Sequence, residues 1–252
     1  MSLSREPIDL HEWAGVTEWD PRVTLAVVFT DIIDSTTLTR TVGDKEMFDM
    51  LVKHFTAARL ELLAYDACEI KIIGDAFMAA FRTADSALQF ALAFRANTGD
   101  SRIAVRAGIH LGQVRIKDND IYGLMVNYAA RLAHIKLRGD EGIFLSAAAK
   151  RDIDSEYGAT QKDFSLTRLL ATQLPGFSAR EEVWRVETAE IRAARIARIR
   201  AKRTEETEKN LIPMVPVPQV AEVRLPDPPR PLSDFARRLI IGPPITGPSK
   251  KN

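Results

Sequence analysis

Short apolar runs alternate with amphipathic stretches along the first three quarters of the chain. The segment Val23–Phe29 is apolar and rich in β-branched residues, a pattern that indicates a buried β-strand. After a polar stretch, apolar residues recur at steps of three and four, which is the spacing of one face of an α-helix. The members of this predicted face are Phe48, Leu51, Phe55, Ala58 and Leu62. The chain therefore opens with a buried strand followed by an amphipathic helix.

Further strand and helix patterns follow in a regular order. A Gly74-Asp75 pair separates two apolar runs, which is the signal of a β-hairpin. The predicted elements from there on are a strand at 70–73, a strand at 77–81, a helix at 83–96, a strand at 103–110, a helix at 123–135 and a last strand at 183–186. The opening order βαββαβ is the ferredoxin-like arrangement. We therefore expect an α+β fold in which an antiparallel sheet carries helices on one face.

Proline content separates a globular part from a tail. Ten of the 13 prolines lie in residues 211–252, and we expect this segment to be a disordered tail because such a composition cannot build a core. The globular domain is expected at 23–188. It follows a leader at 1–22, whose Trp13 and Trp19 we expect to pack on the domain.

The overall charge is nearly balanced. The chain has 35 basic and 34 acidic residues, a formal net charge of +1, so composition gives no reason to expect a nucleic-acid partner. One local concentration of charge stands out, a predicted helix at 189–210 with a basic face. That face carries Arg192, Arg195 and Arg198.

The sequence shows neither a targeting signal nor the cysteines for an internal disulfide. The single cysteine excludes an internal disulfide framework. The first twenty residues lack the charged-then-apolar pattern of a signal peptide. No apolar run approaches the roughly 20 residues that span a bilayer. We therefore expect a cytoplasmic protein without a membrane span.

Two aspartates are expected to meet at one edge of the predicted sheet. Asp31 ends the first strand, and Asp75 lies in the hairpin turn. Because the first and third strands of a βαββαβ sheet are neighbours, both carboxylates fall at the same edge, within a few ångströms. Two such carboxylates repel each other unless a cation lies between them, and hard oxygen ligands suit Mg²⁺ or Mn²⁺. Taken singly, however, Asp31 is also an ordinary strand-end residue and Asp75 an ordinary turn residue.

Two further clusters could contact phosphate. The turn after Asp31 begins a helix, whose free backbone N–H groups can hold phosphate oxygens, although every helix needs such a capping turn. Farther along, Asn127 and Arg131 are four residues apart and share a helix face. Together they suit a phosphate whose charge grows in a transition state, and they could equally form a hydrogen-bonded pair on the surface.

Four segments taken together resemble the catalytic domain of the class III adenylate/guanylate cyclases, of the bacterial single-domain type. These are Phe29–Ile32, Lys71–Asp75, Gly108–Gly112 and Tyr122–Arg131. They occur in the family's order across roughly residues 23–186. The resemblance implies the class III nucleotide cyclase fold and a lyase activity that cyclises a ribonucleoside triphosphate.

The resemblance also implies roles for individual residues. Asp31, Ile32 and Asp75 match the metal site, which holds two divalent cations, Mg²⁺ or Mn²⁺. Lys71 and Asp120 match the pair that reads adenine, which favours ATP over GTP.

The remaining assignments concern the ribose and the phosphates. Asn127 would orient the ribose, and Arg131 would stabilise the transition state. The substrate-binding turn at the helix start comprises Ile33, Asp34, Ser35 and Thr36.

In this family the active site forms between two subunits, so the resemblance implies a homodimer. One subunit supplies the aspartates, and the other supplies the base-reading pair, the Asn and the Arg. A two-fold axis then gives two equivalent sites. The product would be a 3′,5′-cyclic monophosphate, most simply cyclic AMP, with pyrophosphate as the leaving group. A cyclic-nucleotide-reading effector in another chain is a candidate partner.

Alternative functions remain open at this point. A guanylate cyclase, or a pyrimidine cyclase that makes cCMP or cUMP in antiphage defence, would share the scaffold. A nucleotide-binding regulatory domain without activity is the alternative from another class, and such domains generally lose a metal aspartate or the Asn/Arg pair. The Gly-Gly-Asp-Glu-Phe turn of diguanylate cyclases is absent, because the hairpin here reads Ile73-Gly74-Asp75-Ala76-Phe77.

One departure from the family pattern concerns the triphosphate. Family members often carry a lysine in a Leu-Lys-Gly run near the last strands, whereas the similar stretch here, residues 171–176, contains none. Arg168 and Arg180 are the candidate substitutes, and the sequence does not choose between them.

Overall fold

The computed structural model describes residues 8–135, 142–157, 164–169, 172–177, 180–193, 196–197 and 200–201. Contacts divide the chain into two units, Met1–Glu208 and Lys209–Asn252, and the second unit lies outside the described residues. The predicted tail at 211–252, residues 202–210 of the predicted basic helix, and Arg195 and Arg198 of its basic face lie outside the described residues. Residues 189–193, 196–197 and 200–201 are helical.

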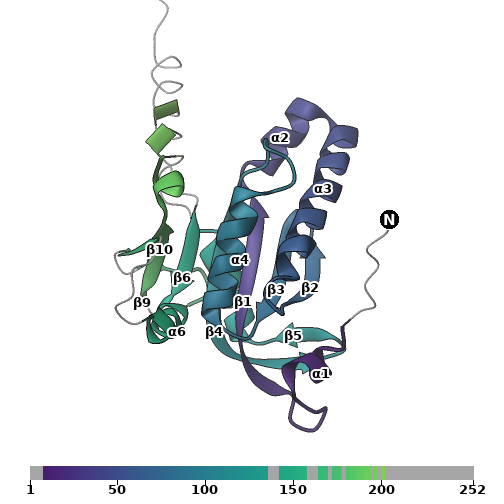
Figure 1. Cartoon of the computed structure of the whole chain (residues 1–252), viewed down its shortest axis with the longest axis vertical. Coiled ribbons are helices and arrows are strands. Elements are labelled where there is room, and N and C mark those ends of the chain that lie inside the picture. Colours follow the sequence, from purple (N-terminus) through teal and green to yellow (C-terminus); the bar gives the residue numbers. More distant parts are fainter. Residues whose placement is uncertain are drawn as a thin grey trace, which may run out of the picture. The chain divides into compact units, whose positions relative to one another are not determined.

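Figure 1 shows helices packed on a twisted sheet. The helices are α1 (Leu10–Ala14), α2 (Ser35–Val42), α3 (Asp44–Leu62), α4 (Ala84–Ala96), α5 (Leu124–Ala133) and α6 (Ala147–Tyr157). The strands are β1 (Arg22–Ile32), β2 (Cys68–Ile73), β3 (Ala76–Phe81), β4 (Val105–Lys117), β5 (Asp120–Tyr122), β6 (Ile143–Ser146), β7 (Ser165–Arg168), β8 (Thr172–Gln173), β9 (Arg180–Glu181) and β10 (Val183–Glu187). The predicted hairpin, the strand after it and the helices α4 and α5 are thereby confirmed, with bounds shifted by a few residues.

The sheet confirms the ferredoxin-like core. Its strand order is β2-β3-β1-β4-β6-β10-β7, and β5 pairs with β4. β1 is antiparallel to β3, with Thr30 opposite Phe77, and antiparallel to β4, with Val28 opposite Ile109. β1 is therefore a central strand, which explains why the sequence from Val23 onward is apolar without alternation.

The α+β fold class holds, but two details of the prediction were wrong. β6 runs parallel to β4, with Gly108 opposite Phe144, so the sheet is mixed rather than antiparallel throughout. The helices also cover both faces. Ala26 and Val28 pack in a cluster that includes side chains of α3, α4 and α6, whereas Leu25 and Val27 pack in a cluster that includes side chains of α1 and α5. Because successive strand residues point to opposite faces, a helix layer on each side buries β1 completely.

Two side-chain predictions also differ from the structure. Phe48 was assigned to the buried face of its helix but is 66% exposed, because α3 buries Met47 and Met50 instead. Gly43, with a positive φ of 86°, separates α2 from α3. In the leader, Trp13 is buried as expected, whereas Trp19 is 97% exposed.

No helix in the described part of the chain is both long enough and apolar enough to cross a bilayer.

Helix α5 approaches β4 so closely that a glycine is required between them. A Cβ added to Gly108 would lie 2.3 Å from the carbonyl oxygen of Ala129 and 2.3 Å from the backbone nitrogen of Ala133. Both are backbone atoms and cannot rotate away. The small residues Ala129 and Ala133 complete this contact.

We expect Gly108→Ala to destabilise the fold by about 3 kcal/mol, at the upper end of the range for overpacked interiors. Urea unfolding measures this loss. Gly112→Ala is the matched control, because its added Cβ would first meet the flexible Met125 side chain at 2.7 Å. If the two variants lost equal stability, the rigid backbone contact at Gly108 would not be the constraint described here.

Candidate active site

The carboxylate of Asp31 lies at the end of β1 in a nearly buried position. Its Oδ2 accepts a hydrogen bond from Arg106 Nε at 2.9 Å and a second bond from the same guanidinium. His134 Nε2 lies 3.5 Å from the same oxygen. Each of these contacts is made by Oδ2, so among the described residues nothing bonds Oδ1, which can take another ligand.

Asp75 lies at the same edge of the sheet, as predicted. The register places Thr30 opposite Phe77, so Asp31 and the turn that holds Asp75 are at adjacent strand ends. One side-chain oxygen of Asp75, Oδ2, is buried and has no hydrogen-bond partner among the described residues. A buried carboxylate oxygen without a partner is costly unless something outside the chain satisfies it.

The donor set at this edge fits a hard divalent cation. It offers the open Oδ1 of Asp31 and the unpartnered Oδ2 of Asp75, both of them carboxylate oxygens. The described residues hold no group of three or more His, Cys, Asp and Glu side chains with the geometry of a complete metal cage. A cation here would therefore complete its coordination with oxygens from elsewhere, as Mg²⁺ does when it binds a phosphorylated substrate.

Lys71 and Asp120 come from different strands and meet. Lys71 Nζ donates to Asp120 Oδ2 at 2.5 Å, and the two side chains are 39% and 22% exposed. The second carboxylate oxygen of Asp120 accepts from the backbone N–H of Ile121 at 2.8 Å. One chain thus holds both members of the predicted base-reading pair side by side.

The turn from β1 into α2 has an unusual backbone. Asp34 adopts a left-handed conformation with φ of 55°, and its side chain does not cap the helix. Ile33 is buried, Asp34 and Thr36 are exposed, and Ser35 is intermediate. The first N–H groups of α2 are therefore not taken up by the side chain at the N-cap position.

Helix α5 presents Asn127 and Arg131 away from its own sheet. Both residues are exposed, and neither side chain has a hydrogen bond or an ion pair with other described residues. The surface pair considered from the sequence is therefore not formed. Both groups remain available to a ligand or to another chain.

The opposite side of α5 is fixed by an aromatic stack. The ring of Tyr128 lies 4.5 Å from that of His110 and 4.9 Å from that of Phe177. Its hydroxyl donates to Glu181 Oε2 at 3.1 Å, and burial together with Glu181 raises the pKa of Tyr128. This anchoring sets the direction in which Asn127 points.

The sequence analysis missed Arg106 and His134. Arg106 lies opposite Asp31 on β4, and His134 follows the last turn of α5, where its Nδ1 bonds the carbonyl of Ala130 at 2.8 Å. Arg106 stands two residues before Gly108 in a predicted strand, but its place opposite Asp31 follows only from the pairing of β1 with β4. His134 carried no comparable signal.

The two arginines proposed to replace the missing lysine lie elsewhere. Arg168 is on β7, at the far edge of the sheet from β2, and its Nε bonds Glu182 at 3.1 Å. Arg180 is exposed on β9, which belongs to a separate two-stranded sheet. Among the described residues, the arginine that contacts Asp31 is Arg106.

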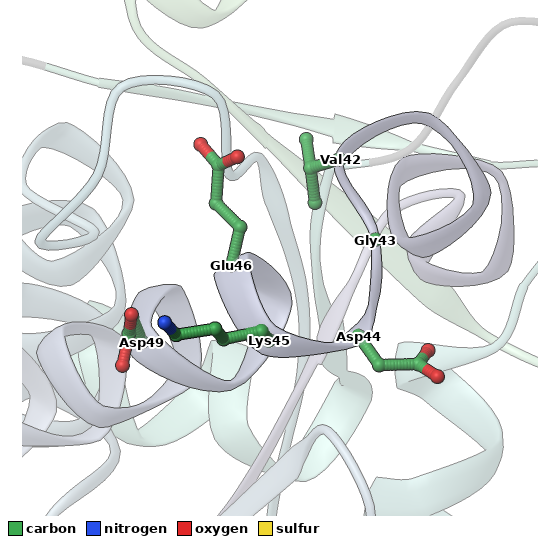
Figure 2. A pocket seen from close by; sticks show the side chains of 6 residues that line it. All are labelled: Val42, Gly43, Asp44, Lys45, Glu46 and Asp49. Carbon is green, nitrogen blue, oxygen red and sulfur yellow. The ribbon is translucent and has the colours of Figure 1, made fainter.

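A surface pocket at the junction of α2 and α3 contains none of these residues. Figure 2 shows that the carboxylates of Asp44, Glu46 and Asp49 point in different directions. Glu46 is also paired with Arg102 at 2.5 Å. The pocket therefore does not gather its acidic groups around a common ligand.

Comparison with known sequences identifies one domain family. The family described as the adenylate and guanylate cyclase catalytic domain matches residues 18–184. Adenylate cyclases of Streptomyces griseus and Streptomyces coelicolor are 34% and 32% identical over 112 and 114 residues. These matches cover 43% and 44% of this chain, and the chain spans only 28% and 30% of the two relatives.

Solved structures share the fold at low sequence identity. The adenylyl cyclase CyaB of P. aeruginosa aligns with a TM-score of 0.57 and 21% identity, covering 67% of this chain and 95% of that one. The guanylate cyclase domain of RhGC from Catenaria anguillulae, in complex with GTP, aligns with a TM-score of 0.54 and 22% identity, covering 66% and 96%. Since an adenylyl cyclase and a guanylate cyclase fit about equally well, the fold does not show whether the substrate's base is adenine or guanine.

We expect His110 to make stability depend on pH. Burial lowers its pKa to about 4, whereas an unfolded histidine titrates near 6.5. Between these values the unfolded chain binds the extra proton, so stability is full above about pH 6.5 and falls as the pH drops toward 4. From pH 7 to pH 5 the loss from His110 is about 2 kcal/mol.

The measurement is urea unfolding of the wild type and His110→Gln at both pH values. Burial also lowers the pKa of His54, so the wild-type slope contains both histidines and the difference between variants isolates His110. His11→Gln, at a partly exposed histidine, serves as the control. Equal slopes in the wild type and His110→Gln would contradict a neutral, buried His110.

Proposed function

We propose that this chain, which belongs to the adenylate and guanylate cyclase catalytic domain family, converts ATP to 3′,5′-cyclic AMP and pyrophosphate in a homodimer. The observation that supports ATP as the substrate is the direct contact between Lys71 and Asp120. The reaction joins the ribose 3′-oxygen to the α-phosphorus and breaks the bond from the α-phosphorus to the bridging oxygen of the pyrophosphate.

The Lys71–Asp120 pair offers one donor and one acceptor side by side. Adenine presents the matching edge, an acceptor at ring nitrogen N1 and a donor at the 6-amino group. Lys71 would donate to N1 and Asp120 would accept from the amino group. Guanine presents the reverse pattern, a 6-oxo acceptor and an N1–H donor, and a mismatched buried polar group costs binding energy. The ion pair keeps the two groups together, which supports selection of ATP.

The aspartates would hold the cations. Asp31 and Asp75, with Ile32 next to Asp31, would bind two divalent ions, which when present lower the pKa of the 3′-hydroxyl and neutralise the phosphates. The unpartnered Oδ2 of Asp75 supports this assignment.

Other groups of the chain would bind the triphosphate. The open N–H groups at the start of α2, from Ser35 onward, suit phosphate oxygens. Arg106 neutralises Asp31 in the absence of a cation. A cation at Asp31 would release this guanidinium to the phosphates, which would offset the missing lysine.

Exposed polar and apolar side chains support an active site that is shared between two copies of the chain. Asn127 and Arg131 point outward without partners, so they can complete the site of a second copy. Large apolar side chains near the base-reading pair are also exposed. Their exposed fractions are 36% for Ile72, 52% for Ile73, 49% for Tyr122 and 58% for Leu124. A group of exposed apolar residues rimmed by polar ones is typical of an interface.

The direct test is turnover of the purified chain with ATP, GTP, CTP and UTP in parallel, each with Mn²⁺ and with Mg²⁺, and with chromatographic separation of products. Cyclic AMP as the main product supports the proposal. A cyclic guanosine or pyrimidine nucleotide would retain the cyclase chemistry and contradict the base assignment. Absence of any product from an intact dimer would favour the inactive, nucleotide-binding alternative.

We expect Asp75→Ala to abolish turnover, because the cation site loses a buried carboxylate oxygen that accepts no hydrogen bond from the described residues. Mn²⁺ binding, followed by the electron paramagnetic resonance of the free ion, should weaken in parallel. Asp49→Ala, an exposed aspartate on α3, is the matched control and should leave both readouts unchanged. Near-normal turnover of Asp75→Ala would rule out the two-cation mechanism.

Asn127→Ala should reduce kcat by about 10²–10³, as removal of one preorganised donor does in other enzymes. Steady-state kinetics separate kcat from KM. Asn127→Asp, which keeps the shape but replaces the donor with a negative charge, should lose at least as much. A rise in KM alone would mean that Asn127 holds the substrate without acting in the transition state.

A further inference from the structure

The side chain of Asn119 joins two distant parts of the chain. Its Oδ1 accepts from the backbone N–H of Leu10 at 2.8 Å, and its Nδ2 donates to the carbonyl of Ile8 at 3.0 Å. Both ends of the amide are therefore used to hold the backbone where α1 begins. Figure 1 shows α1 beside β5, at the end of the sheet where the β4–β5 hairpin turns.

Helix α1 is itself firmly attached to the sheet. Trp13 Nε1 donates to the carbonyl of Asp66 at 3.1 Å, and the guanidinium of Arg82 lies 4.9 Å from the centre of the Trp13 ring. Leu10 is 1% exposed and belongs to the same apolar cluster as Ile121, which is 2% exposed. Helix α1 therefore contacts both the segment just before β2, through Trp13, and the short strand β5, through Leu10.

The residue after Asn119 is Asp120, one half of the base-reading pair. Asp120 begins β5, a strand of three residues that pairs only with the end of β4. So short a strand has few hydrogen bonds of its own, and its position depends on what holds its ends. One end is held by Asn119, and the Asp120 side chain reaches Lys71 on β2.

We infer that Asn119 is a positioning residue for base recognition. By binding the backbone at Ile8 and Leu10, it fixes the hairpin that presents Asp120 at the correct distance from Lys71 and from the purine edge. Helix α1 then contributes to the preference of the site for ATP over GTP. This inference rests on the proposed function, because it concerns how the same site distinguishes ATP from GTP.

The turn itself allows a clean test. Asp118 and Asn119 form a two-residue loop with positive φ values of 52° and 56°. Such loops favour Asn-Gly and Asp-Gly. Asn119→Gly therefore keeps, or improves, the turn and removes only the side chain that binds the leader. Asp118→Gly is the matched control, since it introduces the same residue into the same turn, and the Asp118 side chain is exposed with only a 3.9 Å contact to Lys117.

We expect Asn119→Gly to raise KM for ATP by about 3–10-fold and to lower the ratio of kcat/KM for ATP over GTP by a similar factor. The value of kcat with saturating ATP should stay within about twofold of wild type, because the cation site and Asn127 are untouched. Asp118→Gly should behave as wild type in all three quantities. A drop in thermal stability without a change in the ATP-to-GTP ratio would assign Asn119 a purely structural role and overturn the inference.

A second variant tests the route through α1. Leu10→Ala removes a buried contact of the helix without touching the turn, and it should lower the ATP-to-GTP ratio in the same direction. Because both changes loosen one element, their effects should not add in the double variant. Full additivity would mean that Asn119 acts independently of α1 and would contradict the inference.

A second assay tests the role of Asn119 even if the proposed cyclase activity is absent. If the wild type turns over no triphosphate, fluorescent mant-ATP and mant-GTP titrations replace kinetics, and the ratio of dissociation constants is compared in wild type, Asn119→Gly and Asp118→Gly. Hydrogen exchange at the Ile121 amide reports on the hairpin at the same time. A changed ratio with faster exchange only in Asn119→Gly supports the inference, and an unchanged ratio overturns it.

Discussion

The antiparallel pairing of β1 with both β3 and β4 is the constraint on which the rest of the structure depends. It puts the end of β1 next to the hairpin turn and opposite Arg106, so Asp31, Asp75 and a guanidinium share one edge of the sheet. The same pairing buries β1 on both faces and therefore requires a helix layer on each side. Helix α5 supplies the second layer, and its close approach over Gly108 determines where the outward-pointing Asn127 lies.

Charge at this edge is only partly balanced by other described residues. Asp31 is neutralised by Arg106, whereas Asp75 keeps a buried oxygen without a partner. A carboxylate edge that is half compensated has a strong preference for a cation, because each added positive charge removes repulsion between the two aspartates and satisfies a desolvated oxygen. Lys71 on β2 and Asp120 on β5 form an ion pair with each other, and this pair is the part of the chain that we propose reads the uncharged base.

The sequence predicted the core strands, the hairpin and the meeting of Asp31 with the turn at Asp75, because these follow from hydrophobic period and from short connections. It did not predict the parallel pairing of β6 or the second helix layer, since both depend on contacts between residues far apart in the chain. Arg106 was missed for the same reason, as its role appears only when the register of β1 and β4 is known. Phe48 was misplaced because the first turns of α3 bury Met47 and Met50, the residues beside the expected face. The residue roles themselves came from a resemblance to a family, because neither hydrophobic period nor spacing assigns a chemical role to a side chain.

The most direct test of the central claim, a cyclase site built from two copies of the chain, is complementation between two inactive variants. Asp75→Ala lacks the cation site and Asn127→Ala lacks the ribose contact, so a mixed dimer contains one intact site and one doubly defective site. After unfolding and refolding an equal mixture, half of the dimers are mixed, and cyclic AMP formation should return to about a quarter of the wild-type rate. Activity that stays at the level of the separate variants, in a mixture shown to contain mixed dimers, would contradict a site shared between subunits.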